Sequence, residues 1–159
     1  MASIREGCDN PHVEPRVMIG LSTGARWSEA ERSGPASVRN GVITFSGTKI
    51  GKVRSVPISA DLQTLLLKHW RQHGPFTPAV TSFRRALART TIELPKGQAA
   101  HVLRHTFASH FMLKGGSILT LHEILGHSCL AVTMRYAHLA PDHLRDAVML
   151  GPSVLKPKH

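Results

Sequence analysis

The sequence contains few cysteines, few aromatic residues and no long apolar run, and each shortage excludes a class of protein. Cys8 and Cys129 are the only cysteines among 159 residues, too few for a disulfide framework, so a reducing cytoplasm is expected. No apolar run approaches the roughly 20 residues that cross a bilayer. Neither a membrane span nor a signal peptide is predicted. Aromatic residues make up 5% of the chain, which disfavours binding of single strands by base stacking.

Acidic residues are scarce as well. The chain has 20 Lys and Arg against 10 Asp and Glu, a formal net charge of +10. No acid lies between Glu31 and Asp61. That gap holds five basic residues: Arg32, Arg39, Lys49, Lys52 and Arg54. Such a stretch fits a polyanionic partner, although a merely solubilising basic surface accounts for the charge equally well.

Periodicity predicts one α+β domain that is mostly helical. The length and the 42% of hydrophobic residues are enough for a core. Asn40-Gly41 joins two β-prone runs and a third follows at 53–59, which predicts a small three-stranded antiparallel sheet with Lys49 in its second turn. Helical spacing is found in ranges 12–22, 28–31 (started by a Ser28/Glu31 capping box), 59–73, 77–91, 99–114, 117–125, 130–135 and 141–150. The stripe predicted to be buried in 99–114 comprises Val102, Leu103, Phe107 and Phe111.

The stretch from His101 to Tyr136 carries residue types suited to phosphate chemistry. His101 and Arg104 are three positions apart, so on a helix they share one face. Arginine binds phosphate oxygens through a planar, two-pronged donor set. Tyr136 is the only tyrosine of the chain, and a phenolic oxygen can act as a covalent nucleophile. Together these residues point to attack on a phosphodiester.

Several motifs in order resemble the C-terminal core of the tyrosine recombinases, the phage integrase family. The family pattern is His-x-x-Arg-His, then Leu-Gly-His, then a Tyr, and HVLRHTFASH, LGH and MRYAH match it in this order. TGARWSEAE (23–31) and the hairpin TKIGKVRSVPIS (48–59) extend the resemblance upstream. It covers nearly all of the chain from about Val17 and is strongest to integrases of temperate phages and genomic islands. It implies the tyrosine-recombinase catalytic fold.

The resemblance implies six catalytic residues: Arg26, Lys49, His101, Arg104, His127 and Tyr136. The two arginines would hold the nonbridging oxygens of the scissile phosphate and stabilise its charge. The two histidines would donate to a phosphate oxygen or transfer a proton. The lysine would protonate the departing 5′ oxygen. The tyrosine would attack, leaving a 3′-phosphotyrosyl link and a free 5′-OH.

Four further residues are expected to support this set. Glu29 is expected to position an active-site Arg or His, and His105 to orient its neighbours. Lys52 and Arg54 are expected to bind DNA, and Lys52 is also an alternative general acid. No metal and no cofactor are expected, because Arg, Lys and His provide the positive charge that Mg²⁺ provides elsewhere.

Three other interpretations compete with a recombinase. His101 and His105 lie four positions apart, which raises a zinc site, but HVLRH lacks the Glu of H-E-x-x-H and the Cys spacing makes no site. A non-catalytic DNA-binding module is disfavoured by the intact set of six positions. A type IB topoisomerase shares the chemistry and is the main alternative, although the MRYAHLAPDHL tail favours a recombinase.

The resemblance also implies partners and domain organisation. The expected partners are double-stranded DNA attachment sites, three further copies in a homo-tetramer on DNA, and accessory DNA-bending proteins, with no membrane. The expected location is the cytoplasm of a bacterial host, at the nucleoid. Residues 1–159 are expected to form an isolated catalytic domain that lacks the family's N-terminal core-binding domain. Residues 140–159 are expected to form a tail helix and extension, with Leu144 and Val148 docking on a neighbouring protomer in the complex on DNA and, as the alternative in the free fragment, back on their own protomer.

Overall fold

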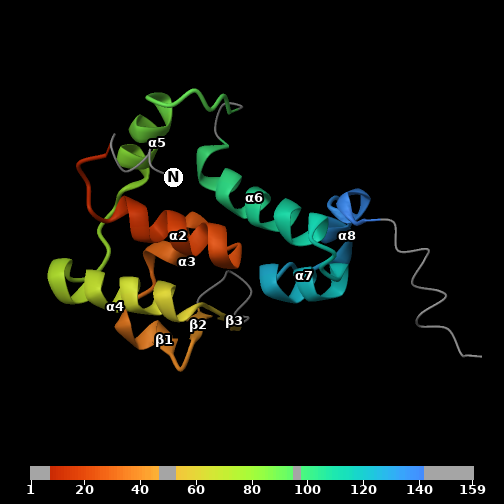
Figure 1. Ribbon diagram of the computed structural model, residues 1–159, viewed down its shortest axis with the longest axis horizontal. Helices are drawn as coiled ribbons and strands as arrows, with labels where there is room; N and C mark the ends of the chain where they lie inside the picture. The colour runs from red at the N-terminus through yellow and green to blue at the C-terminus, as the bar shows by residue number, and fades with distance from the viewer. Residues whose placement is uncertain (1–7, 47–52, 95–97, 142–159) are drawn as a thin grey trace, which may run out of the picture.

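A helical body carries a small sheet on one side in this computed structural model, which describes residues 8–46, 53–94 and 98–141 (Figure 1). The predicted α+β class, mostly helical, is confirmed. The predicted tail helix at 141–150 and most of the tail lie outside the described residues. The α-helices are α2 (Val13–Thr23), α3 (Trp27–Glu31), α4 (Ala60–His73), α5 (Val80–Ala88), α6 (Ala99–Leu113), α7 (Ile118–Leu125) and α8 (Leu130–Met134), with 3₁₀ turns η1 (Pro35–Ser37) and η2 (Ala137–Leu139).

The sheet is antiparallel in the order β1 (Val38–Arg39), β2 (Val42–Phe45) and β3 (Arg54–Pro57), as the sequence predicts. Asn40 and Gly41 both have positive φ, 49° and 73°, which is the geometry of a two-residue hairpin turn whose twist matches that of the strands. The second turn, with Lys49 and Lys52, lies outside the described residues.

Three clusters of buried apolar side chains hold these elements together. The first lies between the sheet and α4 and the second between α2 and α5. The third joins α6, α7 and the segment after α8, and it includes Tyr136. In Figure 1, α6 runs from beside α5 to α7 and α8, so this helix links the second and third clusters. In the part of the chain that is described, no helix is long and apolar enough to cross a membrane.

The start of α3 differs from the prediction. The helix begins at Trp27, and the backbone N–H of Arg26 donates to Glu29 Oε2 at 2.7 Å. Glu29, rather than Glu31, is therefore the acid that caps the first turn, and Ser28 lies exposed inside the helix. The N-cap residue is Arg26, whose side chain cannot accept a hydrogen bond, so only the carboxylate half of a capping box is present, and the buried Glu29 supplies it.

The buried face of α6 is also rotated relative to the prediction. Leu103 is buried as predicted, but Val102, Phe107 and Phe111 are only half-buried. Arg104 and Ala108 are buried instead. Apolar residues surround this helix on several sides, so spacing alone does not fix the face that packs on α2 and α7. The rotation turns Arg104 toward the interior.

Candidate active site

Gly24 closes α2 and brings three segments together. Its φ is +64°, and a Cβ there would lie 2.6 Å from Leu125 Cδ2 and 2.7 Å from Phe107 Cδ1. A side chain is therefore excluded both by the backbone conformation and by the close packing. The turn places Arg26 next to α6 and α7, and the carbonyl oxygen of Gly24 accepts a hydrogen bond from Arg104.

Arg104 is a cation fixed inside the protein. Its side chain extends from α6, and the residue is only 6% exposed. Its Nη1 donates to the Gly24 carbonyl at 2.8 Å, and its Nη2 donates to the Leu125 carbonyl at 2.7 Å. Burial, aided by the charges of Arg26 and Arg54, lowers the pKa of Arg104 to about 10. The guanidinium still carries its charge at neutral pH, in a fixed plane.

Glu29 is the carboxylate around which two other arginines are arranged. Its oxygens accept from Arg54 Nη2 at 2.6 Å, from Arg26 Nη1 at 3.2 Å and from the Arg26 backbone N–H at 2.7 Å. Burial acts to raise the pKa of Glu29, but the backbone hydrogen bond and the charge of Arg54 outweigh it, so the pKa is lowered. Glu29 thus stays ionised and positions Arg26, whose side chain is 39% exposed.

Arg54 lies in the interior, which does not fit the expected role in binding DNA. Its guanidinium stacks over the Phe45 ring, 4.5 Å from the centroid, and its Nη1 donates to the Ile124 carbonyl at 2.5 Å. A Cβ on Gly126, whose φ is +62°, would lie 2.8 Å from Arg54 Cδ. Residues of β3 alternate between buried and exposed, and Arg54 is one of the buried residues. Its side chain therefore points at Glu29 and not at solvent. Its position supports a role in holding Glu29.

His127 follows α7 and rests on Thr133 of α8. Its Nδ1 lies 2.8 Å from Thr133 Oγ1, and His122 Nδ1 lies 3.2 Å from the same oxygen. The hydroxyl has one proton to donate. We assign this proton to His127, the nearer ring, which places the proton of that ring on Nε2. Burial, together with the charges of Arg104 and Arg26, lowers the pKa of His127 to about 4, so the ring is neutral at pH 7.

Tyr136 follows α8 directly and is 6% exposed. Its Oη lies 2.5 Å from His105 Nδ1, on α6. Burial raises the pKa of Tyr136, while the charges of Arg135 and Arg104 act in the opposite direction. His101 is exposed one turn earlier on α6 and is close enough to affect the pKa of His105.

The structure therefore gathers most of the sequence-predicted site residues around α6. Lys49 and Lys52 lie outside the described residues. Sequence reasoning missed Thr133, although its position on α8, three residues before Tyr136, was a usable signal. Among the described residues, no group of three His, Cys, Asp or Glu side chains could hold a metal ion.

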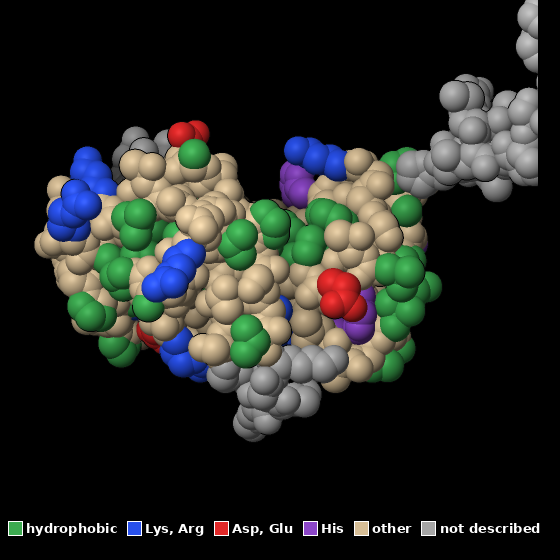
Figure 2. All heavy atoms as spheres, turned by 90° about the horizontal axis from the view of Figure 1, so that it is seen from below, with side chains coloured by type: hydrophobic (Ala, Val, Ile, Leu, Met, Phe, Trp, Pro, Cys, Tyr) green, Lys and Arg blue, Asp and Glu red, His purple; other side chains and the backbone are tan. Residues whose placement is uncertain are grey.

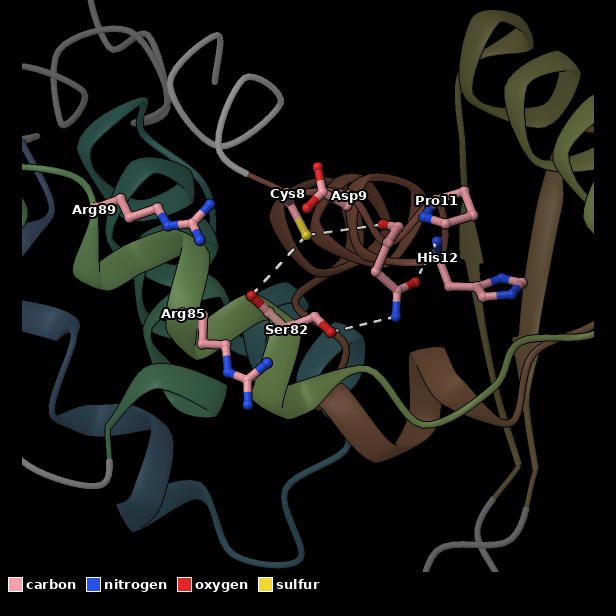
Figure 3. A pocket seen from close by; sticks show the side chains of 8 residues that line it. Cys8, Asp9, Pro11, His12, Ser82, Arg85 and Arg89 are labelled. Atoms are coloured by element: carbon pink, nitrogen blue, oxygen red, sulfur yellow. Dashed lines mark hydrogen bonds between the residues drawn. The ribbon is translucent and has the colours of Figure 1, made fainter.

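A surface hollow at another place in the molecule is not part of this cluster. It lies between the segment Cys8 to His12 and helix α5, and Figure 3 shows Ser82 and Arg85 of α5 and Arg89, just after that helix, along its wall. None of the sequence-predicted site residues lines it. On the face shown in Figure 2, Lys and Arg side chains are spread over the surface and acidic side chains are few, in agreement with the net charge of +10.

The buried Tyr136 thus lies beside His105, and it is close enough to the fixed cation Arg104 for that charge to act on its pKa. The model of the phage integrase family matches residues 2–143. The chain belongs to this family.

Relatives and solved structures agree with this assignment. The integrase of Escherichia phage 186 is 53% identical over 146 residues, which cover 92% of this chain and 43% of that protein. The catalytic domain of bacteriophage HP1 integrase superposes with a TM-score of 0.84 at 48% identity, covering 99% of this chain and 93% of that one. The recombinase XerH, in a pre-cleavage complex with its difH substrate, has the same fold (TM-score 0.71, 24% identity, 96% of this chain and 51% of that one). The chain spans less than half the length of the phage 186 integrase.

Proposed function

We propose that this chain is the catalytic part of a site-specific DNA recombinase that integrates and excises a phage or genomic island. The observation that carries the proposal is the contact of the only tyrosine, Tyr136, with His105 beside the buried cation Arg104. The similarity to phage integrases supports it. The substrate is double-stranded DNA at attachment sites, in the cytoplasm of a bacterial host at the nucleoid.

Cleavage in this proposal is a transesterification. Oη of Tyr136 attacks the scissile phosphorus, and the bond to the 5′ oxygen breaks. Arg26 and Arg104 stabilise the charge that develops on the nonbridging oxygens. His127 donates from Nε2, since its Nδ1 is engaged by Thr133. His101 is exposed on the same helix as Arg104 and completes the donor set.

The proton for the leaving 5′ oxygen comes from Lys49 in this proposal, with Lys52 as the alternative donor. The free 5′-OH of a partner duplex then attacks the phosphotyrosine. The bond energy is conserved in that link, so strand exchange requires no nucleotide cofactor.

The full assembly is proposed to be a homo-tetramer on two DNA duplexes, with accessory DNA-bending proteins where the attachment sites require them. In this assembly the catalytic domain 1–159 works together with an N-terminal core-binding domain, and tail residues 140–159 pack on a neighbouring protomer. The exposed apolar side chains of α8, Leu130, Val132 and Met134, offer such a tail a surface beside the nucleophile.

A type IB topoisomerase uses the same covalent step and is the alternative activity. The second step distinguishes a topoisomerase from a recombinase. A topoisomerase rejoins the strand that it cut, whereas a recombinase joins a strand from another duplex. The similarity to integrases favours the recombinase.

The test begins by footprinting the full-length protein on candidate element–host junctions. A nicked suicide duplex that carries the protected junction is then incubated with wild type and with Tyr136→Phe. The wild type should form a detergent-resistant protein–DNA adduct. The phenylalanine variant should bind the duplex and form none, because it lacks the nucleophilic oxygen. An adduct with Tyr136→Phe would refute the assignment of the nucleophile.

A further inference from the structure

His105 is the only described side chain with a hydrogen bond to the nucleophile of the proposed reaction. Its Nδ1 lies 2.5 Å from Tyr136 Oη, and the two ring planes meet at 46°. The residues come from different parts of the chain, the middle of α6 and the segment between α8 and η2. The third apolar cluster fixes both elements, so the contact is built into the fold rather than made by two mobile side chains.

The protonation states at neutral pH allow the phenol to donate this hydrogen bond to the ring. Burial, aided by the charges of Arg135, His101 and Arg104, lowers the pKa of His105. Burial raises the pKa of Tyr136. The resting pair is therefore a phenol and a neutral imidazole. A neutral ring that carries its proton on Nε2 presents a lone pair at Nδ1, and the phenol then donates to it.

We propose that His105 accepts the phenolic proton when Tyr136 attacks DNA. As the bond from Oη to phosphorus forms and the bond from phosphorus to the 5′ oxygen breaks, the phenolic proton moves to Nδ1 and gives an imidazolium. The 5′ oxygen takes its proton from the separate general acid. During rejoining, the imidazolium returns its proton to Oη. The inference rests on the proposed function, because it assigns the base of that same reaction.

The surrounding charges explain why the transfer awaits the substrate. His105 is faced by Arg104 and His101 from its own helix and by Arg135 from the end of α8. These groups oppose an imidazolium in the free protein. A phosphodiester brings negative charge next to the same groups and compensates them. Tyr136 thus keeps its phenolic proton until DNA is bound, so the nucleophilic phenolate does not form in the absence of substrate.

The first experiment needs no DNA. ¹⁵N NMR of the histidine side chains reports whether each ring nitrogen carries a proton. At neutral pH, His105 Nδ1 should be of the unprotonated type, and its resonance should move when Tyr136→Phe removes the phenol. A protonated Nδ1 in the resting protein would overturn the proposal, because such a nitrogen cannot accept a proton.

The second experiment measures single-turnover cleavage of the nicked junction duplex across a pH series. His105→Ala should cleave about 10²–10⁴-fold more slowly, bind the duplex as well as wild type, and regain rate when imidazole is added. The acidic limb of the wild-type profile should be absent from the variant. His110→Ala, an exposed histidine of the same helix, should behave as wild type. His105→Gln keeps much of the side-chain volume, and its thermal unfolding separates lost folding from lost chemistry.

The outcomes distinguish this inference from the proposed function. If wild type forms the Tyr136 adduct and His105→Ala does so at an unchanged rate, only the base assignment fails. If the rate falls but imidazole restores nothing and the acidic limb remains, His105 merely positions the tyrosine, and the base assignment again fails. If wild type forms no adduct at all, the proposed function itself fails.

Discussion

Replacing Glu29 by Gln should remove the carboxylate that holds two of the three arginines around the site. The side chains of Glu29 and Arg54 are 1% and 7% exposed. The substitution keeps the shape of the side chain but leaves Arg54 as a buried cation without its counter-charge. Breaking a buried pair in this way costs about 3–5 kcal/mol of the free energy of unfolding. For a domain of this size, that corresponds to a fall in Tm of roughly 6–20 °C.

The measurement is urea and thermal unfolding of wild type, Glu29→Gln and Glu93→Gln. Glu93 is exposed, so its substitution should change the free energy of unfolding by no more than about 0.5 kcal/mol. The reasoning is refuted if Glu29→Gln is as stable as the Glu93 control. Such a result would mean that Arg54 finds other compensation as readily as it finds Glu29.

The pH dependence gives the same prediction an independent check. The pKa of Glu29 is lowered from its ordinary value of 4.5. A lowered pKa in the folded state contributes stability that is complete above the unfolded-state pKa and is lost as the pH falls through the folded-state pKa. The difference in free energy of unfolding between wild type and Glu29→Gln should therefore be constant at neutral pH and should decrease progressively as the pH falls below 4.5. A gap that widens in acid would contradict the assignment.

Two further predictions concern the reacting groups. Thr133→Val leaves His127 Nδ1 without its hydroxyl donor and should slow cleavage in the suicide-substrate assay by up to about 100-fold. Thr133→Ser keeps the hydroxyl and should retain most of the wild-type rate. Thr120→Val changes an exposed threonine of α7 and is the control in the same assay. Lys49→Ala should slow cleavage about 10²–10⁴-fold, and a duplex with sulfur at the 5′ bridging position should restore the rate, because a thiolate leaves without a proton. The same duplex should not rescue Arg104→Ala, and rescue of both variants alike would move the general acid elsewhere.

The elements of this fold could be predicted because their local signals are strong. Asn40-Gly41 sets the hairpin, and the Ser59 hydroxyl caps α4 by accepting from the backbone N–H of Leu62. Gly126, in the left-handed conformation, ends α7 as predicted. In each case a few neighbouring residues determine the backbone, so reading the chain locally is sufficient.

The orientation of the charged side chains could not be predicted in the same way. Arg54 was expected to bind DNA, but β3 directs its side chain at Glu29, 25 positions away in the sequence. Arg16 is fully buried between aromatic rings, and the His12 and His69 rings, 57 positions apart, lie within 3.0 Å of one another. Such pairings depend on how helices pack, and a single sequence carries no periodic signal for them.

The same packing explains how the site concentrates positive charge where phosphate chemistry requires it. Arg104 is held by two carbonyl oxygens and faces the like charges of Arg26 and Arg54, with Glu29 as their shared counter-ion. Since an incompletely compensated buried charge costs stability, the free protein holds this arrangement only because the fold stabilises it elsewhere. In the proposed reaction, a phosphodiester would supply the missing negative charge, and its attacked form would supply more. In the proposed reaction, the interactions between these arginines and their counter-charge would therefore strengthen as the reaction proceeds, which is the condition for catalysis by preorganised charge.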